Sequence, residues 1–235
     1  MINKVTNNYF LVLFSLMPIS IISGSLISMI NILFIDISFL ILIMINKDYS
    51  SLKSKPVKYL FLFYLYLVFN SLMSFDREIG LARNLGFIRM IILFIAFNYF
   101  FNQKIFLNKV LYAWSVILFF VVFDVFFESF SGRNILGYGG EEYGRRLVSF
   151  FKDEPIVGGY LNAFYLILIG FLYLRFGEKY KNYVIFLSIL ILLSILLTGE
   201  RSNLIKAILG ISLFYVFFRE YQIKHKFYFA IVALL

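Results

Sequence analysis

Long apolar blocks separated by short polar stretches are the feature of this sequence that most restricts its fold. The first block runs from Tyr9 to Ile45. As one helix it would be about 55 Å long at ~1.5 Å per residue, nearly twice the ~30 Å thickness of a bilayer core. We therefore predict two membrane-spanning helices joined by a tight turn near Ser23-Gly24-Ser25. Helices suit such blocks because every backbone polar group must be satisfied internally in lipid.

Composition excludes several classes of protein and site. The chain is 62% hydrophobic and 15% charged, with a mean hydropathy of +0.89, whereas soluble domains are about a quarter charged. It has no cysteine and one histidine, which excludes disulfides, thiolate chemistry and an imidazole metal cluster. The net charge of +9 is not gathered in a basic soluble region, so no nucleic-acid partner is predicted. In a membrane protein, such an excess sets orientation and contacts anionic lipid head groups.

The remaining apolar blocks extend the prediction to an all-α, polytopic transmembrane helical bundle. About eight spans are expected to be complete. A ninth begins at Phe227 and stops at Leu235, too short to cross a bilayer, so we expect residues 1–235 to be a single transmembrane domain truncated at its C-terminus. The spans after the first two are predicted at Val57–Ser74, Leu85–Phe101, Leu107–Phe127, Ile156–Phe176, Tyr183–Thr198 and Leu204–Phe218.

The distribution of cations predicts a cytoplasmic N-terminus. With that orientation, 13 of the 22 Lys and Arg residues face the cytoplasm and 9 face outward, in agreement with the positive-inside rule. The inner group is mostly Lys, whereas seven of the nine outer cations are Arg. Arginine offers a planar fork that suits phosphate and carboxylate, so the outer face is predicted to hold an anion site. Pairing of these arginines with outer carboxylates such as Asp124 and Glu128 is the alternative.

The longest outer loop, 128–155, reads ESFSGRNILGYGGEEYGRRLVSFFKDEP. Its glycine-rich first half, 132–142, is predicted to be a mobile surface loop. In the second half, two charged clusters bracket the apolar segment Leu147–Phe151, directly before a span. We predict a short amphipathic segment that holds both clusters at head-group level. The clusters are Arg145-Arg146 and Lys152-Asp153-Glu154.

A second outer motif, Leu197-Thr198-Gly199-Glu200-Arg201-Ser202-Asn203, is a tight turn between two short spans. Short spans leave their ends recessed or thin the bilayer locally. Polar groups at that depth are costly, so they usually serve a functional site or a fixed ion pair. A simple ion pair between Glu200 and Arg201 is the alternative to a functional site.

The two motifs resemble those of the O-antigen polymerase and O-antigen ligase superfamily. Residues 146–155, RLVSFFKDEP, running into Gly158-Gly159-Tyr160-Leu161, resemble its loop-to-span motif: R-L-x-G/S-x-F, a short polar stretch with Pro, then small residues that open a helix. Thr198-Gly199-Glu200-Arg201-Ser202 is similar to its T-x-S-R-[GS] turn. Glu200 replaces the usual small residue, and Asp153-Glu154-Pro155 replaces an Asn-Pro-Asn-like stretch. Both departures look more like polymerase-like members than ligases.

The resemblance implies glycosyl transfer at the periplasmic face of a bacterial inner membrane. The donor would be an oligosaccharide on undecaprenyl pyrophosphate and the acceptor another lipid-linked glycan, with no metal, cofactor or nucleotide sugar. A chain-length regulator and other polysaccharide-assembly proteins are possible partners. Arginines aimed at the leaving pyrophosphate would stabilise its developing charge. The implied catalytic residues are Arg146, Arg201, Glu154 and Glu200, and the implied substrate-binding residues are Arg145, Lys152, Asp153 and Ser202.

Three other functions remain open from the sequence. An O-antigen ligase would differ in its acceptor, lipid A-core. A transporter or flippase for lipid-linked glycans would place charges through the spans around a cavity, yet Asp36 is the clearest mid-span charge here. We expect Asp36 to pair with Arg89 or Arg83. A purely structural membrane subunit would leave the arginine asymmetry unexplained.

Overall fold

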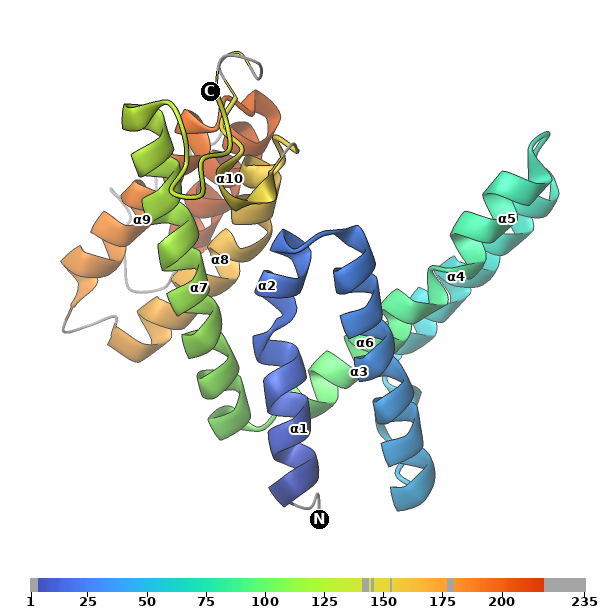
Figure 1. The fold of residues 1–235 in the computed structure, drawn as a ribbon. Coiled ribbons are helices and arrows are strands. Elements are labelled where there is room, and N and C mark those ends of the chain that lie inside the picture. Colours follow the sequence, from blue (N-terminus) through green and yellow to red (C-terminus); the bar gives the residue numbers. More distant parts are fainter. Residues whose placement is uncertain (1–3, 141–143, 145, 153, 177–179, 218–235) are drawn as a thin grey trace. The chain divides into compact units, whose positions relative to one another are not determined.

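The computed structural model describes residues 4–140, 144, 146–152, 154–176 and 180–217. These residues form helices and connecting turns and contain no strand, so the all-α prediction is confirmed (Figure 1). The chain divides into two compact units, Met1–Ala113 and Trp114–Leu235. The division falls inside helix α7, Lys104–Ser131. A single transmembrane domain stays a prediction.

Within the described residues, five helical segments are long and apolar enough to cross a membrane. The chain is therefore a membrane-embedded protein. The predicted count of about eight complete spans is not confirmed, and the ninth predicted span lies outside the described residues. The five segments are Lys4–Ile22, Ser25–Asn46, Arg77–Phe101, Lys104–Ser131 and Val157–Phe176.

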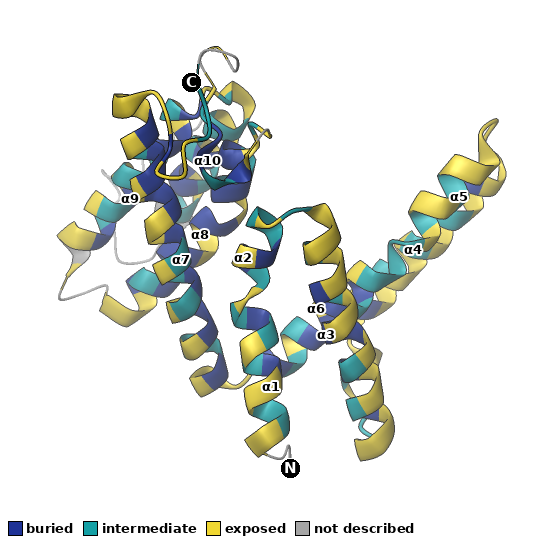
Figure 2. Ribbon diagram, viewed as in Figure 1, coloured by how far each residue is buried: buried dark blue, intermediate teal, exposed yellow. Residues whose placement is uncertain are grey.

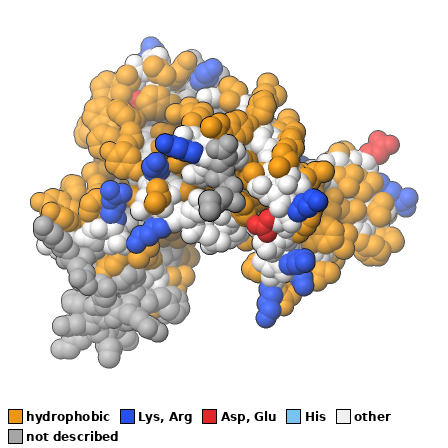
Figure 3. All heavy atoms as spheres, turned by 90° about the horizontal axis from the view of Figure 1, so that it is seen from below, with side chains coloured by type: hydrophobic (Ala, Val, Ile, Leu, Met, Phe, Trp, Pro, Cys, Tyr) orange, Lys and Arg blue, Asp and Glu red, His pale blue; other side chains and the backbone are white. Residues whose placement is uncertain are grey.

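Large apolar side chains on the helix surfaces support the membrane assignment. On α7 alone, Phe119, Phe120 and Phe123 are all more than half exposed. Figure 2 shows exposed residues along many of the helices, and Figure 3 shows hydrophobic side chains over much of one described surface, with separate Lys and Arg groups between them. Soluble proteins rarely expose apolar patches of this extent, whereas lipid tails accept them.

The first unit begins with a helical hairpin. Helices α1 (Lys4–Ser15) and α2 (Met17–Ile22) are followed by α3 (Ser25–Asn46). The turn is made at Gly24, whose φ of 117° is unfavourable for residues with a side chain. The predicted break in the first apolar block is therefore confirmed at its predicted position.

Aromatic rings form the core of the first unit. Phe100 of α6 (Ile88–Phe101) lies 4.3 Å from Phe10, 5.1 Å from Phe106 and 6.3 Å from Phe39 between ring centroids. All four rings are almost completely buried. Tilted and stacked aromatic pairs of this kind add attraction beyond the burial of apolar area. They join α1, α3, α6 and the start of α7.

Asp36 lies within α3 and faces α6, which packs against α3. Its side chain is buried, and neither carboxylate oxygen has a hydrogen-bond partner among the described residues. The Arg89 guanidinium on α6 attracts it electrostatically, yet the Arg89 Nε is likewise buried without a partner in that part of the chain. The predicted partnership with Arg89 is thus an attraction across the packed helices without a direct hydrogen bond.

Residues 77–84 differ from the prediction, which placed them in an outer loop between the spans Val57–Ser74 and Leu85–Phe101. They belong to helix α5, Arg77–Leu85, which packs along α4, Lys55–Leu72. Asn84 donates hydrogen bonds to the Leu67 carbonyl oxygen and to Ser71 Oγ. This segment is too polar to be predicted as a span. It is helical because α4 and these hydrogen bonds cover one side of it.

The second unit contains the C-terminal part of α7, the short 3-10 helix η3 (Ser149–Phe151), α8 (Val157–Phe176), α9 (Lys181–Leu197) and α10 (Arg201–Phe217). Trp114 packs edge-on against Phe164, with 5.2 Å between ring centroids. The Tyr165 hydroxyl donates to the Ser188 carbonyl oxygen at 3.2 Å, which ties α8 to α9. Helix α8 also packs against α10.

Candidate functional site

Two buried carboxylates near the end of α7 hold the segment that carries the first motif. Asp124 and Glu128 are only 0% and 2% exposed. Asp124 accepts hydrogen bonds from Ile135 N at 3.0 Å and Ser149 Oγ at 2.6 Å. Glu128 accepts them from Val148 N at 3.1 Å and Ser149 N at 2.6 Å. All four oxygens of this pair, which we call the carboxylate cradle, are therefore occupied.

The cradle explains why the apolar segment 147–151 is not a surface-lying amphipathic segment. Val148 and Ser149 are fully buried, and Phe151 is nearly so. Ser149 and Lys152 have φ angles of 45° and 55°, a left-handed conformation that costs residues with a side chain about 1–3 kcal/mol each. For Ser149, hydrogen bonds from its own N–H and hydroxyl to the cradle offset that cost. The chain is thereby bent sharply between Arg146 and Lys152.

The glycine-rich segment before the motif is tied to the same place. Asn134 N donates to the Tyr138 carbonyl oxygen at 2.8 Å, and Tyr138 N donates back to Asn134 Oδ1 at 2.7 Å. The Asn134 amide also donates to the Ser149 carbonyl oxygen. A Cβ at Gly139 would collide with Glu128 Oε1, so this glycine permits the close approach. Residues 134–139 are thus anchored, in contrast to the predicted mobile loop.

The second motif is joined to the helix that follows the first. Glu200 Oε1 accepts a hydrogen bond from Gly158 N, the second residue of α8, at 2.7 Å, and Glu200 Oε2 accepts one from Asn203 Nδ2. The contact is tight, because a Cβ at Gly158 would lie 2.6 Å from Thr198 Oγ1 and 2.9 Å from Glu200 Cδ. We call Gly158, Thr198, Glu200 and Asn203 the Glu200 latch. It places both motifs at one end of the second unit.

The described cations of the two motifs are exposed and have no side-chain partner among the described residues. Arg146, Lys152 and Arg201 are exposed, and none makes a hydrogen bond or ion pair through its side chain within the described part of the chain. Asp124, Glu128 and Glu200 accept hydrogen bonds from N–H and O–H donors instead, so the alternative pairings of these arginines with the three acids are not found there. Exposed guanidinium groups without a partner can bind a phosphate or diphosphate.

The structure places every predicted site residue except Arg145 and Asp153. Arg146 precedes the cradle-bound segment, Lys152 and Glu154 follow it, and Arg201 and Ser202 begin α10 next to the latch. Glu154 and Ser202 are exposed, and their side chains make no hydrogen bond among the described residues. Arg145 and Asp153 lie outside those residues. The same part of the chain contains no cluster of three or more His, Asp or Glu side chains that could hold a metal ion.

Sequence reasoning did not find the residues that support the site. The sequence pattern offers Asp124 and Glu128 as possible partners for arginines, and it predicts no role for Asn134 or Asn203. One signal for the cradle was available: two acids four residues apart lie on the same face of a helix. When that face is buried, the segment that packs against it must supply hydrogen-bond donors for both carboxylates. The Gly158 contact is not visible in the sequence, because it joins residues 42 positions apart.

We predict that Glu128→Gln lowers the free energy of unfolding by about 1–3 kcal/mol. The amide keeps one acceptor and puts an NH₂ group against a second backbone N–H, so a buried donor loses its partner. Thermal unfolding in detergent measures the change, and trypsin cleavage after Arg133 or Arg146 should accelerate. The exposed Glu78 provides the control, since Glu78→Gln should stay within about 0.5 kcal/mol of the parent. Equal stabilities for both variants would contradict the role of the cradle.

Comparison with protein-family models, with curated proteins and with solved structures found no match.

Proposed function

We propose that this chain is a membrane glycosyltransferase that polymerises oligosaccharide units carried on undecaprenyl pyrophosphate, for an O-antigen or a related surface polysaccharide. It would act at the periplasmic face of a bacterial inner membrane, as a multi-pass protein with a cytoplasmic N-terminus. The proposal starts from the resemblance of residues 146–161 and 198–202 to the O-antigen polymerase and ligase superfamily.

One observation supports this proposal above the others. The hydrogen bond from Gly158 N to Glu200 Oε1 joins the two motifs, while Arg146 and Arg201 stay exposed and unpaired in the described part of the chain. Two arginines that only balanced neighbouring acids would be paired with them. Here Asp124, Glu128 and Glu200 accept hydrogen bonds from N–H and O–H donors and from no arginine among the described residues, so the positive charge is free for a ligand.

The chemistry assigned to the site is a single glycosyl transfer. The bond between the anomeric carbon of the donor glycan and its pyrophosphate oxygen breaks, and a hydroxyl of the acceptor glycan forms the new glycosidic bond. The hydroxyl proton leaves, and undecaprenyl pyrophosphate departs with the bonding electron pair. Arg146 and Arg201 stabilise the charge that gathers on the pyrophosphate, and Arg145, Lys152 and Ser202 help to bind it.

The two glutamates receive different roles. Both oxygens of Glu200 already accept hydrogen bonds, so we assign Glu200 to positioning Arg201, the next residue. Glu154 is exposed and free among the described residues, so we assign it to the acceptor hydroxyl, as its hydrogen-bond acceptor and general base. Asp153, which lies outside the described residues, keeps the substrate-binding role that the resemblance implies.

Deletion of the gene in its host, followed by electrophoresis of lipopolysaccharide, tests the proposal. We expect the ladder of long glycans to be replaced by core carrying a single repeat. Loss of all glycan from the core, with lipid-linked polymer accumulating, would instead identify a ligase. Loss of both the glycan on the core and the lipid-linked polymer would identify a transporter. An unchanged ladder would reject all three functions. Reporter fusions after Arg146 and Arg201 check that both motifs face the periplasm.

A further inference from the structure

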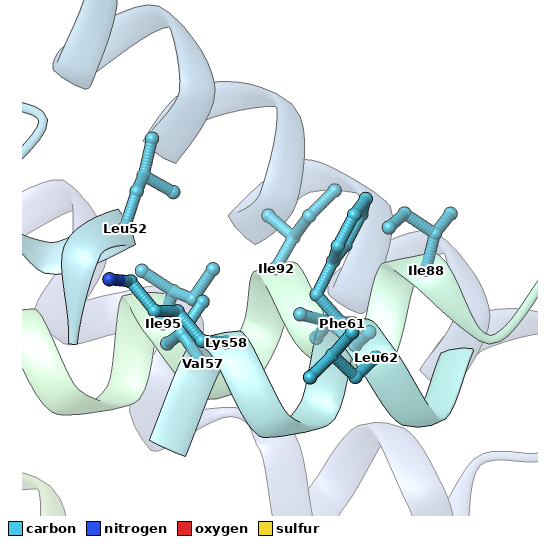
Figure 4. A pocket seen from close by; sticks show the side chains of 9 residues that line it. Leu52, Val57, Lys58, Phe61, Leu62, Ile88, Ile92 and Ile95 are labelled. Carbon is cyan, nitrogen blue, oxygen red and sulfur yellow. The ribbon is translucent and has the colours of Figure 1, made fainter. Parts of the chain in front are cut away.

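An apolar pocket of about 550 Å³ lies between α4 and α6 in the first unit. Four isoleucines at positions 88, 91, 92 and 95 form its α6 wall, with the spacing that places side chains on one helix face. Val57, Phe61 and Leu62 of α4 lie across from them, and Leu52 of η1 (Ser51–Lys53) adds to one end (Figure 4). Its volume is within the ~300–1,000 Å³ common for ligand sites. We call it the α4–α6 pocket.

The rim of the α4–α6 pocket is apolar and open. Phe61 and Leu62 are 46% and 61% exposed. On a membrane-embedded protein, an open apolar rim of this kind suits contact with hydrocarbon chains better than contact with water. The chemistry of the pocket therefore fits the acyl chain of a lipid better than a water-soluble ligand.

A single charged residue, Lys58, lines the α4–α6 pocket. Figure 4 shows Lys58 beside Ile95 at one end of the pocket, with Ile88 at the opposite end. Lysine can lay its methylene stem along apolar surface while its ammonium group stays at head-group level. The pocket therefore has an apolar end and a cationic end, as a lipid with an anionic head group requires.

The same face of α6 becomes polar beyond the cationic end. Asn98 continues the row of Ile91 and Ile95 on the next turn of α6, and Asn102 follows at the C-cap of the helix. They line a second pocket of about 410 Å³, together with the polar segment that precedes α4. Serine and asparagine side chains offer O–H and N–H donors to phosphate and glycerol oxygens. The other residues of this polar pocket are Ser50, Ser51, Ser54, Pro56, Phe94 and Tyr99.

The charge around the polar pocket favours an anionic head group. Residues 47–58 contain four lysines and one carboxylate, Asp48. Hydrogen bonds from the Ser50 hydroxyl at 2.6 Å and the Ser50 amide at 3.2 Å hold the pKa of Asp48 below its usual value. Asp48 is therefore ionised at neutral pH, and the segment still carries an excess of positive charge. Basic residues at a membrane surface attract anionic lipids.

We infer that the α4–α6 pocket binds one anionic phospholipid of the surrounding bilayer. An acyl chain lies along the isoleucine row of α6, and the phosphate lies between Lys58 and the serines and asparagines of the polar pocket. This site is in the first unit and does not depend on the proposed glycosyl transfer, which uses residues of the second.

Lipid retention by the purified full chain tests the inference. The protein in detergent receives phosphatidylglycerol or phosphatidylcholine with identical acyl chains, and native mass spectrometry measures the bound lipid. We expect preferential retention of phosphatidylglycerol, and a loss of about fivefold in Lys58→Gln, since one cation near the surface contributes about a factor of this size. Lys55 lies on the same helix, is exposed and lines neither pocket, so Lys55→Gln should retain the lipid as the parent does.

A second variant separates the acyl-chain site from the head-group site. Ile92→Phe fills the α4–α6 pocket and should lower retention of both lipids, while Lys58→Gln lowers only the preference for phosphatidylglycerol. Circular dichroism and size-exclusion chromatography check that each variant is folded. Equal retention of the two lipids by the parent, equal effects at Lys58 and Lys55, or retention of a polyprenyl phosphate in place of phosphatidylglycerol would each overturn the inference.

Discussion

Gly158→Ala is expected to lower polymer formation by about 100-fold while the protein still inserts in the membrane, because displacing a catalytic group by about 1 Å has an effect of this size. The added Cβ would lie 2.6 Å from Thr198 Oγ1 and 2.9 Å from Glu200 Cδ. Thr198 is buried and hydrogen-bonded to the Ile195 carbonyl oxygen, so it cannot rotate away freely. The turn must therefore move, and Arg201 moves with it. Glycan ladders of a deletion strain that carries the variant measure the effect.

Another glycine of the same helix supplies the control. A Cβ at Gly170 would meet nothing within 4 Å, so Gly170→Ala should leave the ladder unchanged and stabilise α8 by about 0.5–1 kcal/mol. Thr198→Ala in the Gly158→Ala background removes the closest contact and should restore part of the activity. A normal ladder from Gly158→Ala alone would show that the Glu200 latch does not position the site.

The helices of this protein were largely predictable, and their boundaries followed from local chemistry. Hydrophobic block length and Gly24 predicted the first hairpin, and α8 and α9 begin and end within a few residues of the predicted spans. Helix α5 was missed because its own sequence is polar, and its partner surface on α4 exists only after folding. Local patterns contain no information about such a surface.

The charged residues of the candidate site could be chosen from the sequence, but the hydrogen bonds that hold the two motifs in place could not. Arg146 and Arg201 could be chosen because arginine on the predicted outer face favours an anionic partner. The roles of Glu128 and Glu200 could not be deduced from spacing alone, because their partners Ser149 and Gly158 are 21 and 42 residues away. Backbone N–H groups look alike in every sequence, so a carboxylate that binds them cannot be told from one that binds an arginine.

Arg201→Lys is expected to lower polymer formation by about 100-fold without changing the amount of protein in the membrane. Lysine keeps the charge but loses the planar fork that can bind two phosphate oxygens at once, and loss of one preorganised donor to a developing charge lowers turnover by about 10²–10³-fold. Arg201 is exposed and makes no side-chain hydrogen bond or ion pair with any residue that the structure describes, so the substitution removes no internal contact there. Lipopolysaccharide electrophoresis and quantitative immunoblotting of membranes measure both quantities.

A second arginine distinguishes bidentate binding from general surface charge. Arg133 is also exposed and belongs to the same unit, but it lies outside both motifs, so Arg133→Lys should give a normal ladder. If Arg201 only attracted the anionic donor at long range, both lysine variants would keep activity, since their charge is unchanged. A normal ladder from Arg201→Lys would therefore remove Arg201 from the pyrophosphate site and leave Arg146 as its only described arginine.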